Sequence, residues 1–134
     1  MKRVSIFFMG IVTICCITIF SSSCVNNKKD VLFACDSVNV SFSKNIKPIL
    51  VNNCNNCHST SNAPNSGGGI ALETYTDIIN SGYIDDSTTL ANGGDGGRFV
   101  TDVQSGKMPQ SASKLSDCDA TKIKNWVFEG SKDN

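Results

Sequence analysis

The stretch "NNCNNCHST", residues 52–60, carries Cys54 and Cys57 with two asparagines between them and His58 directly after the second cysteine. His58 is the only histidine of the 134-residue chain. Two thiols and an imidazole at this spacing are typical of three kinds of site: a covalently attached cofactor, a metal clip or a redox dithiol. The choice among them also decides the fold, and the surrounding sequence favours one of the three.

The chain begins with a pattern typical of an exported protein. Lys2 and Arg3 precede an apolar run over residues 4–20, and the small residues "SSSC" close it at Cys24. The run is slightly short for a membrane-spanning helix, so a transmembrane anchor is the less favoured alternative. We predict a signal peptide over residues 1–23.

The end of this segment resembles the cleavage site of bacterial lipoproteins, although serine stands where leucine is most common, three positions before the cysteine. On that resemblance Cys24 is the acylated first residue of the mature chain, and residues 24–34 form a polar tether. Several acyl chains give stable anchoring, since each buried methylene contributes roughly 0.8 kcal/mol. An ordinary signal-peptidase cut is the alternative. The predicted location is a lipid anchor on a bacterial membrane, periplasmic or outer-membrane associated.

The net charge of the chain does not indicate a class of partner. Basic and acidic residues number 12 each in the full chain, and removal of Lys2 and Arg3 leaves ten against twelve, a formal net charge of −2. Nucleic-acid binding usually needs a basic patch or stripe. The sequence therefore predicts no nucleic-acid partner.

Four cysteines remain once the signal and Cys24 are set aside: Cys35, Cys54, Cys57 and Cys118. C-x-x-C-H is the pattern of c-type haem attachment, in which both thiols bond to the haem vinyl groups and the imidazole binds iron. That assignment leaves Cys35 and Cys118 as the possible pair in an oxidising compartment. Such a bridge closes more than eighty residues and contributes roughly 4 to 5 kcal/mol in the chain-entropy model. Two unpaired buried cysteines are the alternative.

The other two kinds of site fit the sequence less well. Structural zinc takes four sulfur or nitrogen ligands, which would be Cys54 and Cys57 with Cys35 and Cys118, or with His58. The second pair lacks the close spacing of zinc modules. A redox dithiol needs a thioredoxin-like order of strands and helices, and no such alternation appears. The sequence therefore favours one covalently bound haem c.

A second axial ligand decides whether haem iron moves electrons or binds small molecules. The single histidine excludes bis-histidine ligation, and Met108 is the only methionine outside the signal peptide. It lies in "SGKMPQSAS", where Pro109 biases the preceding residue toward extended geometry. We expect His58 and Met108 to bind the iron; Lys107, an asparagine or an open position are the alternatives.

We predict a helix directly before the motif, because apolar residues recur there at helical spacing. In "SFSKNIKPILVNNC", residues 41–54, Ser43 is a plausible N-cap, and Pro48 falls near the first turn or kinks the helix. The apolar residues that share one face are Phe42, Ile46, Ile49 and Leu50.

The final segment, "LSDCDATKIKNWVFEG" at residues 115–130, has the strongest helix signal. Ser116 and Asp119 approximate a capping box, and Gly130 suits the C-terminal stop. Its apolar face consists of Ile123, Trp126 and Val127. We expect Trp126 to pack against the first helix, with a place beside the haem as the alternative.

Two short helices are predicted between these ends. Ile78 and Ile79 lie in the first, and the second contains Phe99, Val100 and Val103 and ends at Gly106. The stretches "NSGGGI", "DDS" and "NGGDGG" are predicted to be turns, because they match neither a phosphate loop nor a calcium loop.

The whole pattern resembles the class I cytochrome c family, and more narrowly the small lipoprotein cytochrome c domains of Bacteroidota. The segments that carry the resemblance are "CDSVNVSFSKNIKPILVNNCNNCHS" and "MPQSASKLSDCDATKIKNWVFEG". It implies an all-α cytochrome c domain over residues 35–134, in which the N-terminal and C-terminal helices pack together around one covalent haem and the middle is loop-rich. It also implies haem bonds at Cys54 and Cys57, iron ligation by His58 and Met108, and a bridged cysteine pair.

These expectations describe a membrane-anchored monohaem c-type cytochrome that carries one electron at a time between redox proteins of the cell envelope. Such a protein is an electron carrier and not an enzyme. A haem sensor or enzyme with an open sixth position is one alternative. A zinc-stabilised interaction module is the other.

Overall fold

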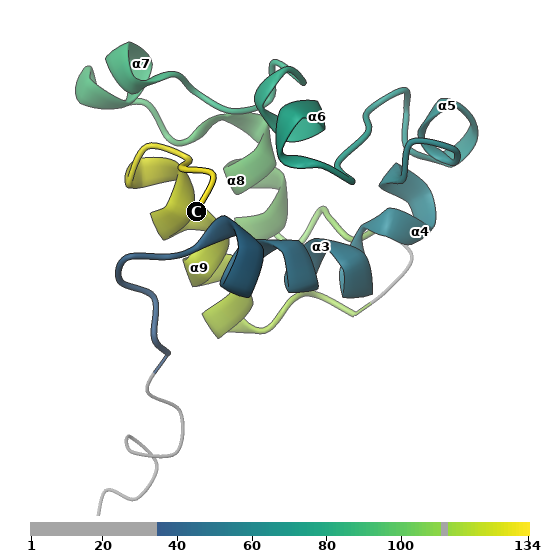
Figure 1. The fold of residues 1–134 in the computed structure, drawn as a ribbon, viewed down its shortest axis with the longest axis horizontal. Helices are drawn as coiled ribbons and strands as arrows, with labels where there is room; N and C mark the ends of the chain where they lie inside the picture. Colours follow the sequence, from purple (N-terminus) through teal and green to yellow (C-terminus); the bar gives the residue numbers. More distant parts are fainter. Residues whose placement is uncertain (1–34, 111–112) are drawn as a thin grey trace, which may run out of the picture. The chain divides into compact units, whose positions relative to one another are not determined.

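The computed structural model describes residues 35–110 and 113–134, so the predicted signal peptide, Cys24 and the tether lie outside the described residues. Cys35–Asn134 forms a compact unit. Its described part is helical and contains no strand (Figure 1), which confirms the all-α prediction there. None of the helices in this part is long and apolar enough to cross a membrane. In chain order the elements are η1 (Phe42–Ile46), α3 (Lys47–Asn53), α4 (Asn55–His58), α5 (Ala63–Ser66), α6 (Tyr75–Ile79), α7 (Ser87–Ala91), α8 (Gly97–Gln104) and α9 (Asp117–Phe128).

The helix predicted before the motif is present, as the π-turn η1 followed by α3. All four residues of its predicted apolar face are buried: Phe42, Ile46, Ile49 and Leu50. Pro48 lies in the first turn of α3, where the α-helical pattern begins after η1. Because the early N–H groups of a helix lack intrahelical partners, proline is tolerated there, and the segment continues.

The N-cap of this segment is Ser41, and the prediction of Ser43 was wrong. Ser41 is extended, and its hydroxyl accepts a hydrogen bond from the Lys44 amide at 3.3 Å. The Ser41 amide in turn donates to Asn45 Oδ1 at 2.9 Å. The Ser43 hydroxyl donates instead to the main-chain oxygen of Asn134 at 2.7 Å.

Helix α9 forms as predicted, with Ser116 as its N-cap and with Ile123, Trp126 and Val127 buried. It packs against η1 and α8, and Figure 1 shows it behind the start of the first helix. The fully buried Trp126 ring lies 5.6 Å from the Phe42 ring, so its predicted packing against the first helix is confirmed.

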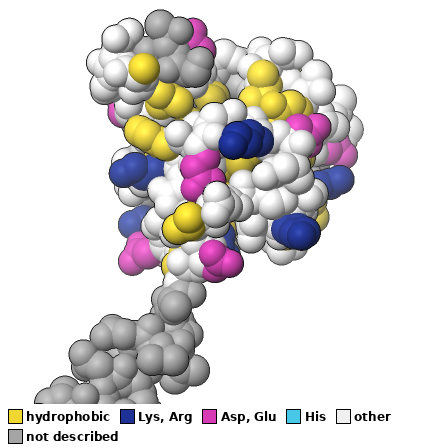
Figure 2. All heavy atoms as spheres, turned by 60° about the vertical axis from the view of Figure 1, so that its left-hand side comes forward, with side chains coloured by type: hydrophobic (Ala, Val, Ile, Leu, Met, Phe, Trp, Pro, Cys, Tyr) yellow, Lys and Arg dark blue, Asp and Glu magenta, His cyan; other side chains and the backbone are white. Residues whose placement is uncertain are grey.

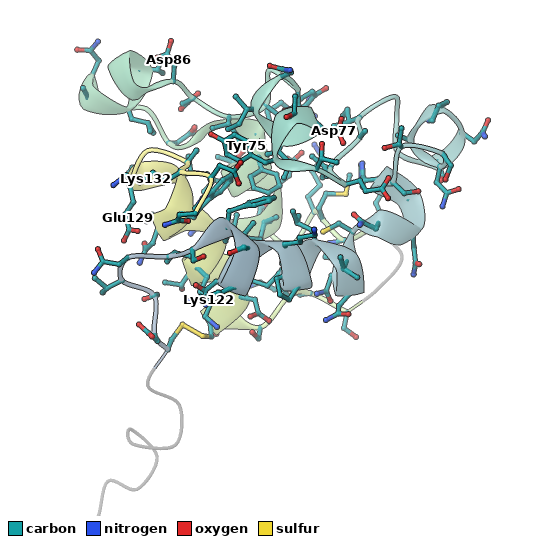
Figure 3. The ribbon with its side chains drawn as sticks, in the orientation of Figure 1. Tyr75, Asp77, Asp86, Lys122, Glu129 and Lys132 are labelled. Atoms are coloured by element: carbon teal, nitrogen blue, oxygen red, sulfur yellow. A yellow bond between two sulfur atoms is a disulfide. The ribbon has the colours of Figure 1, made fainter. Side chains whose placement is uncertain are left out.

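Tyr75, at the start of α6, completes an aromatic cluster with these two rings (Figure 3). Its ring lies 5.4 Å from Phe42 and 6.4 Å from Trp126. The Tyr75 hydroxyl donates to the Ser131 carbonyl, and Trp126 Nε1 donates to the Lys132 carbonyl, both at 2.9 Å. The buried polar atoms of both side chains are therefore satisfied by the segment after α9.

The middle of the chain contains more helix than predicted. Helices α6 and α8 were both predicted. The apolar residues of α8 are buried, but the helix ends at Gln104, before the expected Gly106. In α6, Ile78 is buried and Ile79 is exposed. Helices α5 and α7 were not predicted, and the predicted turns "NSGGGI" and "DDS" overlap only one end of each. Each spans only about one turn, too short for an apolar periodicity to appear in the sequence.

The two ends of the described domain are joined covalently. Cys35 and Cys118 form a disulfide (Figure 3), and their Cα atoms are 5.4 Å apart. Cys118 lies in the first turn of α9. The bond ties the start of the domain to the start of its last helix.

Candidate haem-attachment site

The motif "CNNCH" lies where one helix ends and the next begins. Cys54 is both the C-cap of α3 and the N-cap of α4. Its carbonyl accepts hydrogen bonds from the amides of Cys57 at 3.1 Å and His58 at 2.9 Å. The motif therefore forms a single helical turn, and residues three apart on such a turn share one face.

Both motif cysteines keep free thiols and are partly buried. Cys54 packs against the hydrophobic core. Burial raises the pKa of its thiol to about 11, because desolvation disfavours the thiolate. A redox dithiol needs the opposite, a lowered thiol pKa, and the described residues contain no strand of a thioredoxin-like fold. The two free thiols of the motif remain available for thioether bonds.

The imidazole of His58 is held in one tautomer. Its Nδ1 lies 2.8 Å from the Ile70 carbonyl oxygen. A carbonyl can only accept, so Nδ1 carries the proton and donates, which leaves the Nε2 lone pair free. Metal-binding histidines are commonly oriented by such a hydrogen bond. The Leu72 amide donates to the His58 carbonyl at 2.7 Å, so both the ring and the backbone of His58 are fixed by residues 70–72.

Gly67 leaves room for this arrangement. A Cβ added at Gly67 would lie 2.6 Å from the Cys57 carbonyl oxygen and 3.0 Å from His58 Nδ1. No side chain other than hydrogen fits so close to the motif. The glycine-rich stretch after the motif was predicted only as a turn, whereas its first glycine packs directly on the histidine ring.

Met108 lies in a non-helical loop after α8, as predicted, and is partly buried. Its amide donates to the Asp102 carbonyl at 2.9 Å, which folds the loop back onto the end of α8. The neighbouring Lys107 Nζ lies 3.4 Å from Asp102 Oδ1, so this alternative iron ligand is engaged in an ion pair.

The residues present fit a covalently attached haem better than a zinc ion. The disulfide removes Cys35 and Cys118 from a four-ligand zinc set. Across residues 35–110 and 113–134, no group of three Cys, His, Asp or Glu side chains is placed to hold a metal ion. The motif supplies two free thiols on one helical turn and one imidazole with its Nε2 available, which is the donor set that C-x-x-C-H haem attachment uses.

Two surface pockets lie elsewhere. One, of about 310 Å³, borders Ile70 on the segment that holds His58, and the other, of about 220 Å³, lies beside Val40 and Trp126. Neither is lined by the motif cysteines, His58 or Met108.

Within the motif, the buried Oδ1 atom of Asn55 has no hydrogen-bond partner.

No family model, no curated protein and no solved structure matches this chain. The functional argument therefore depends on the residues themselves. Sequence reasoning proposed the two cysteines, the histidine and the methionine as site residues, but missed the Ile70 carbonyl and Gly67. A main-chain carbonyl has no side-chain signature, and glycine-rich stretches are common in ordinary turns.

Proposed function

We propose that this protein is a membrane-anchored monohaem c-type cytochrome of the cell envelope, with a class I cytochrome c fold, and that it carries one electron at a time between redox proteins. The observation that carries the proposal is the "CNNCH" turn, with its two free thiols and with His58 held through Nδ1 by the Ile70 carbonyl. Packing of the first and last helices against each other supports the proposed fold. Export and lipidation at Cys24 rest on the sequence alone.

The roles of the residues follow from their chemistry. Cys54 and Cys57 would hold the haem through thioether bonds, His58 Nε2 would bind the iron, and Met108 would supply the second axial ligand. The bound haem would supply a one-electron iron couple. The Ile70 carbonyl would keep the imidazole oriented toward the iron, and the hydrogen bond from the Met108 amide to the Asp102 carbonyl would hold the methionine loop against α8. A protein with both axial positions filled transfers electrons and does not activate small molecules.

Replacement of Met108 separates the carrier from a haem sensor or enzyme with an open sixth position. In a Met108→Leu variant of the haem-loaded protein we expect a high-spin ferrous spectrum and rapid carbon monoxide binding. The reduction potential should fall by about 0.1 V or more, part of the roughly 0.8 V span that axial ligands cover. Absorption spectroscopy and potentiometric titration measure both.

Lys107→Gln is the matched control, since Lys107 is the neighbouring residue and one of the alternative candidate ligands. It should leave the spectrum and the ligand-binding behaviour unchanged. A Met108→Leu protein with the spectrum and potential of the original would show that Met108 is not a ligand, and the open-site alternative would then be favoured.

A further inference from the structure

The proposed iron-binding histidine is followed by a loop whose two ends meet. The loop covers residues 59–72 and contains α5, which lies at the right-hand side of Figure 1. We propose that Glu73, directly after the loop, is a positioning residue for His58: its carboxylate closes the loop and so keeps the Ile70 carbonyl against the imidazole. The inference rests on the proposed function and adds a residue to its site.

Three hydrogen bonds join the ends of this loop. The His58 ring donates through Nδ1 to the Ile70 carbonyl at 2.8 Å, and the His58 carbonyl accepts from the Leu72 amide at 2.7 Å. The Thr60 amide donates to Glu73 Oε2 at 2.8 Å. Compact surface loops with adjoining ends frequently carry function. The Glu73 contact is thus one of three that keep the two segments together at the proposed iron ligand.

Glu73 contributes to this closure through its side chain. In the other two contacts the acceptors are main-chain oxygen atoms, which no substitution can remove. The Thr60 hydrogen bond lowers the pKa of the Glu73 carboxyl, so the exposed side chain is ionised at neutral pH. Hydrogen bonds to an ionised acceptor are roughly twice as strong as those between neutral groups. Glu73 is therefore the position at which the sequence sets how firmly the loop is closed.

The interior of the loop supports Ile70 from the other side. The Ile70 amide donates to the Gly67 carbonyl at 3.1 Å. The Gly67 and Gly69 amides both donate to the carbonyl of the buried Ala63, at 3.1 and 2.8 Å. These contacts do not involve Glu73. Loss of the Glu73 contact should therefore loosen the Ile70 carbonyl while the loop and the domain stay folded.

A looser Ile70 carbonyl has a defined effect on the proposed ligand. A hydrogen bond from the second ring nitrogen to a carbonyl raises the basicity of a metal-binding histidine. A more basic imidazole stabilises ferric iron more than ferrous iron, because the ferric ion carries the larger positive charge. Glu73 should therefore keep the reduction potential lower than it would be with an open loop.

Two variants and one control separate the hydrogen bond from the charge. Glu73→Ala removes both, whereas Glu73→Gln removes the charge and keeps a side-chain oxygen as acceptor. Asp77→Ala is the matched control: this carboxylate, labelled in Figure 3, also accepts an amide hydrogen bond, from Thr74 at 3.0 Å, but the contact caps α6. Acidic side chains occur among basic ones on the face shown in Figure 2 as well, so loss of charge alone is not specific to Glu73.

The test reads the hydrogen bonds and the iron separately. The full-length, ¹⁵N-labelled protein with covalent haem is studied in a nonionic detergent in the ferrous state. Nuclear magnetic resonance measures how fast the His58 Nδ1 proton and the Thr60 amide proton exchange with water, which reports local opening. Potentiometric titration gives the reduction potential of the same samples.

In Glu73→Ala we expect the Thr60 amide to exchange about ten-fold faster than in the original protein, and the His58 Nδ1 proton about three-fold faster. The reduction potential should rise by about 18 mV or more, a two-fold change in the reduction equilibrium at about 59 mV per tenfold. Glu73→Gln should keep most of the protection of both protons and show a smaller rise. Asp77→Ala should leave both exchange rates unchanged.

Unchanged exchange of the His58 proton in Glu73→Ala would overturn the inference. An equal rise of the potential in Glu73→Gln and Glu73→Ala would also overturn it, because the effect would then come from the charge. Absence of a haem spectrum before titration would instead overturn the proposed function. Exchange of the His58 proton can still be measured in a haem-free chain, so the two failures are distinguishable.

Discussion

At the scale of single residues, the site depends on His58 and on the backbone groups around it. The Ile70 carbonyl selects the Nδ1–H tautomer, and Gly67 leaves the space in which the ring and the Cys57 carbonyl lie together. The sequence identifies His58 because it is unique in the chain. It does not identify Ile70, whose contribution comes from a carbonyl that every residue has.

Gly67→Ala should disturb the motif directly. The added Cβ meets two backbone atoms, Cys57 O at 2.6 Å and Ala63 Cα at 2.9 Å, and backbone cannot move aside as a flexible side chain can. We expect a loss of about 1–3 kcal/mol of stability, as for other overpacked sites, and a lower yield of covalently bound haem. Chemical denaturation and the haem-to-protein absorbance ratio measure the two effects.

Gly68→Ala is the matched control for this substitution. A Cβ there meets nothing within 4 Å, although the backbone φ of +63° is strained for alanine. It should cost about 1–2 kcal/mol of stability through that strain, with the haem yield preserved. If Gly67→Ala keeps the full haem yield, the proposed packing of Gly67 against the site is wrong.

At the scale of elements, the amphipathic helices and the short helix α6 could be predicted, whereas the one-turn helices α5 and α7 could not. Apolar residues recur at helical spacing in the first helical segment, at Phe42 and Ile46, and in α9, at Ile123 and Trp126. All four are buried, because the face of a helix that packs on the core is the face on which its apolar residues recur. The choice between Ser41 and Ser43 as N-cap depends on contacts from Asn45 and Asn134, which local sequence does not reveal. Helices α5 and α7 are single turns that bury little apolar surface.

Glu129, the C-cap of α9, holds the segment that leads into the first helix (Figure 3). Its carboxylate accepts hydrogen bonds from the amides of Asn39 at 3.0 Å and Val40 at 2.8 Å. Glu129→Ala leaves both amides without this acceptor and should cost about 1–3 kcal/mol. The midpoint of urea denaturation measures the loss. Glu129→Gln retains one acceptor oxygen and should lose less, so equal losses in the two variants would contradict the role of the carboxylate.

At the scale of the whole molecule, a small helical domain is closed by one disulfide and one aromatic cluster. The bond between Cys35 and Cys118 joins residues 83 apart in sequence, and Trp126 packs with Phe42 and Tyr75 from three different elements. The pairing could be predicted only on the assumption that Cys54 and Cys57 are used by a haem. The aromatic cluster could not, because Tyr75 lies in a five-residue helix with little periodicity.

Removal of this disulfide should be among the most costly changes outside the core. In the chain-entropy model, closure of a loop this long contributes about 4.5 kcal/mol. We expect a Cys35→Ser/Cys118→Ser double variant to lose most of that amount in denaturant unfolding, while its haem spectrum stays unchanged. Reduction of the original protein should reproduce the loss, and a loss below about 1 kcal/mol would contradict a stabilising role for the bond.

The central claim is that Cys54 and Cys57 carry one covalently bound haem, and the haem content of the chain tests it most directly. The full-length chain is produced in a host with a c-type haem-attachment system and measured by pyridine haemochrome absorbance and intact mass after denaturation. We predict one haem per chain that survives denaturation, and none in a Cys54→Ser/Cys57→Ser variant. An exported, disulfide-bonded chain with no covalent haem would contradict the account.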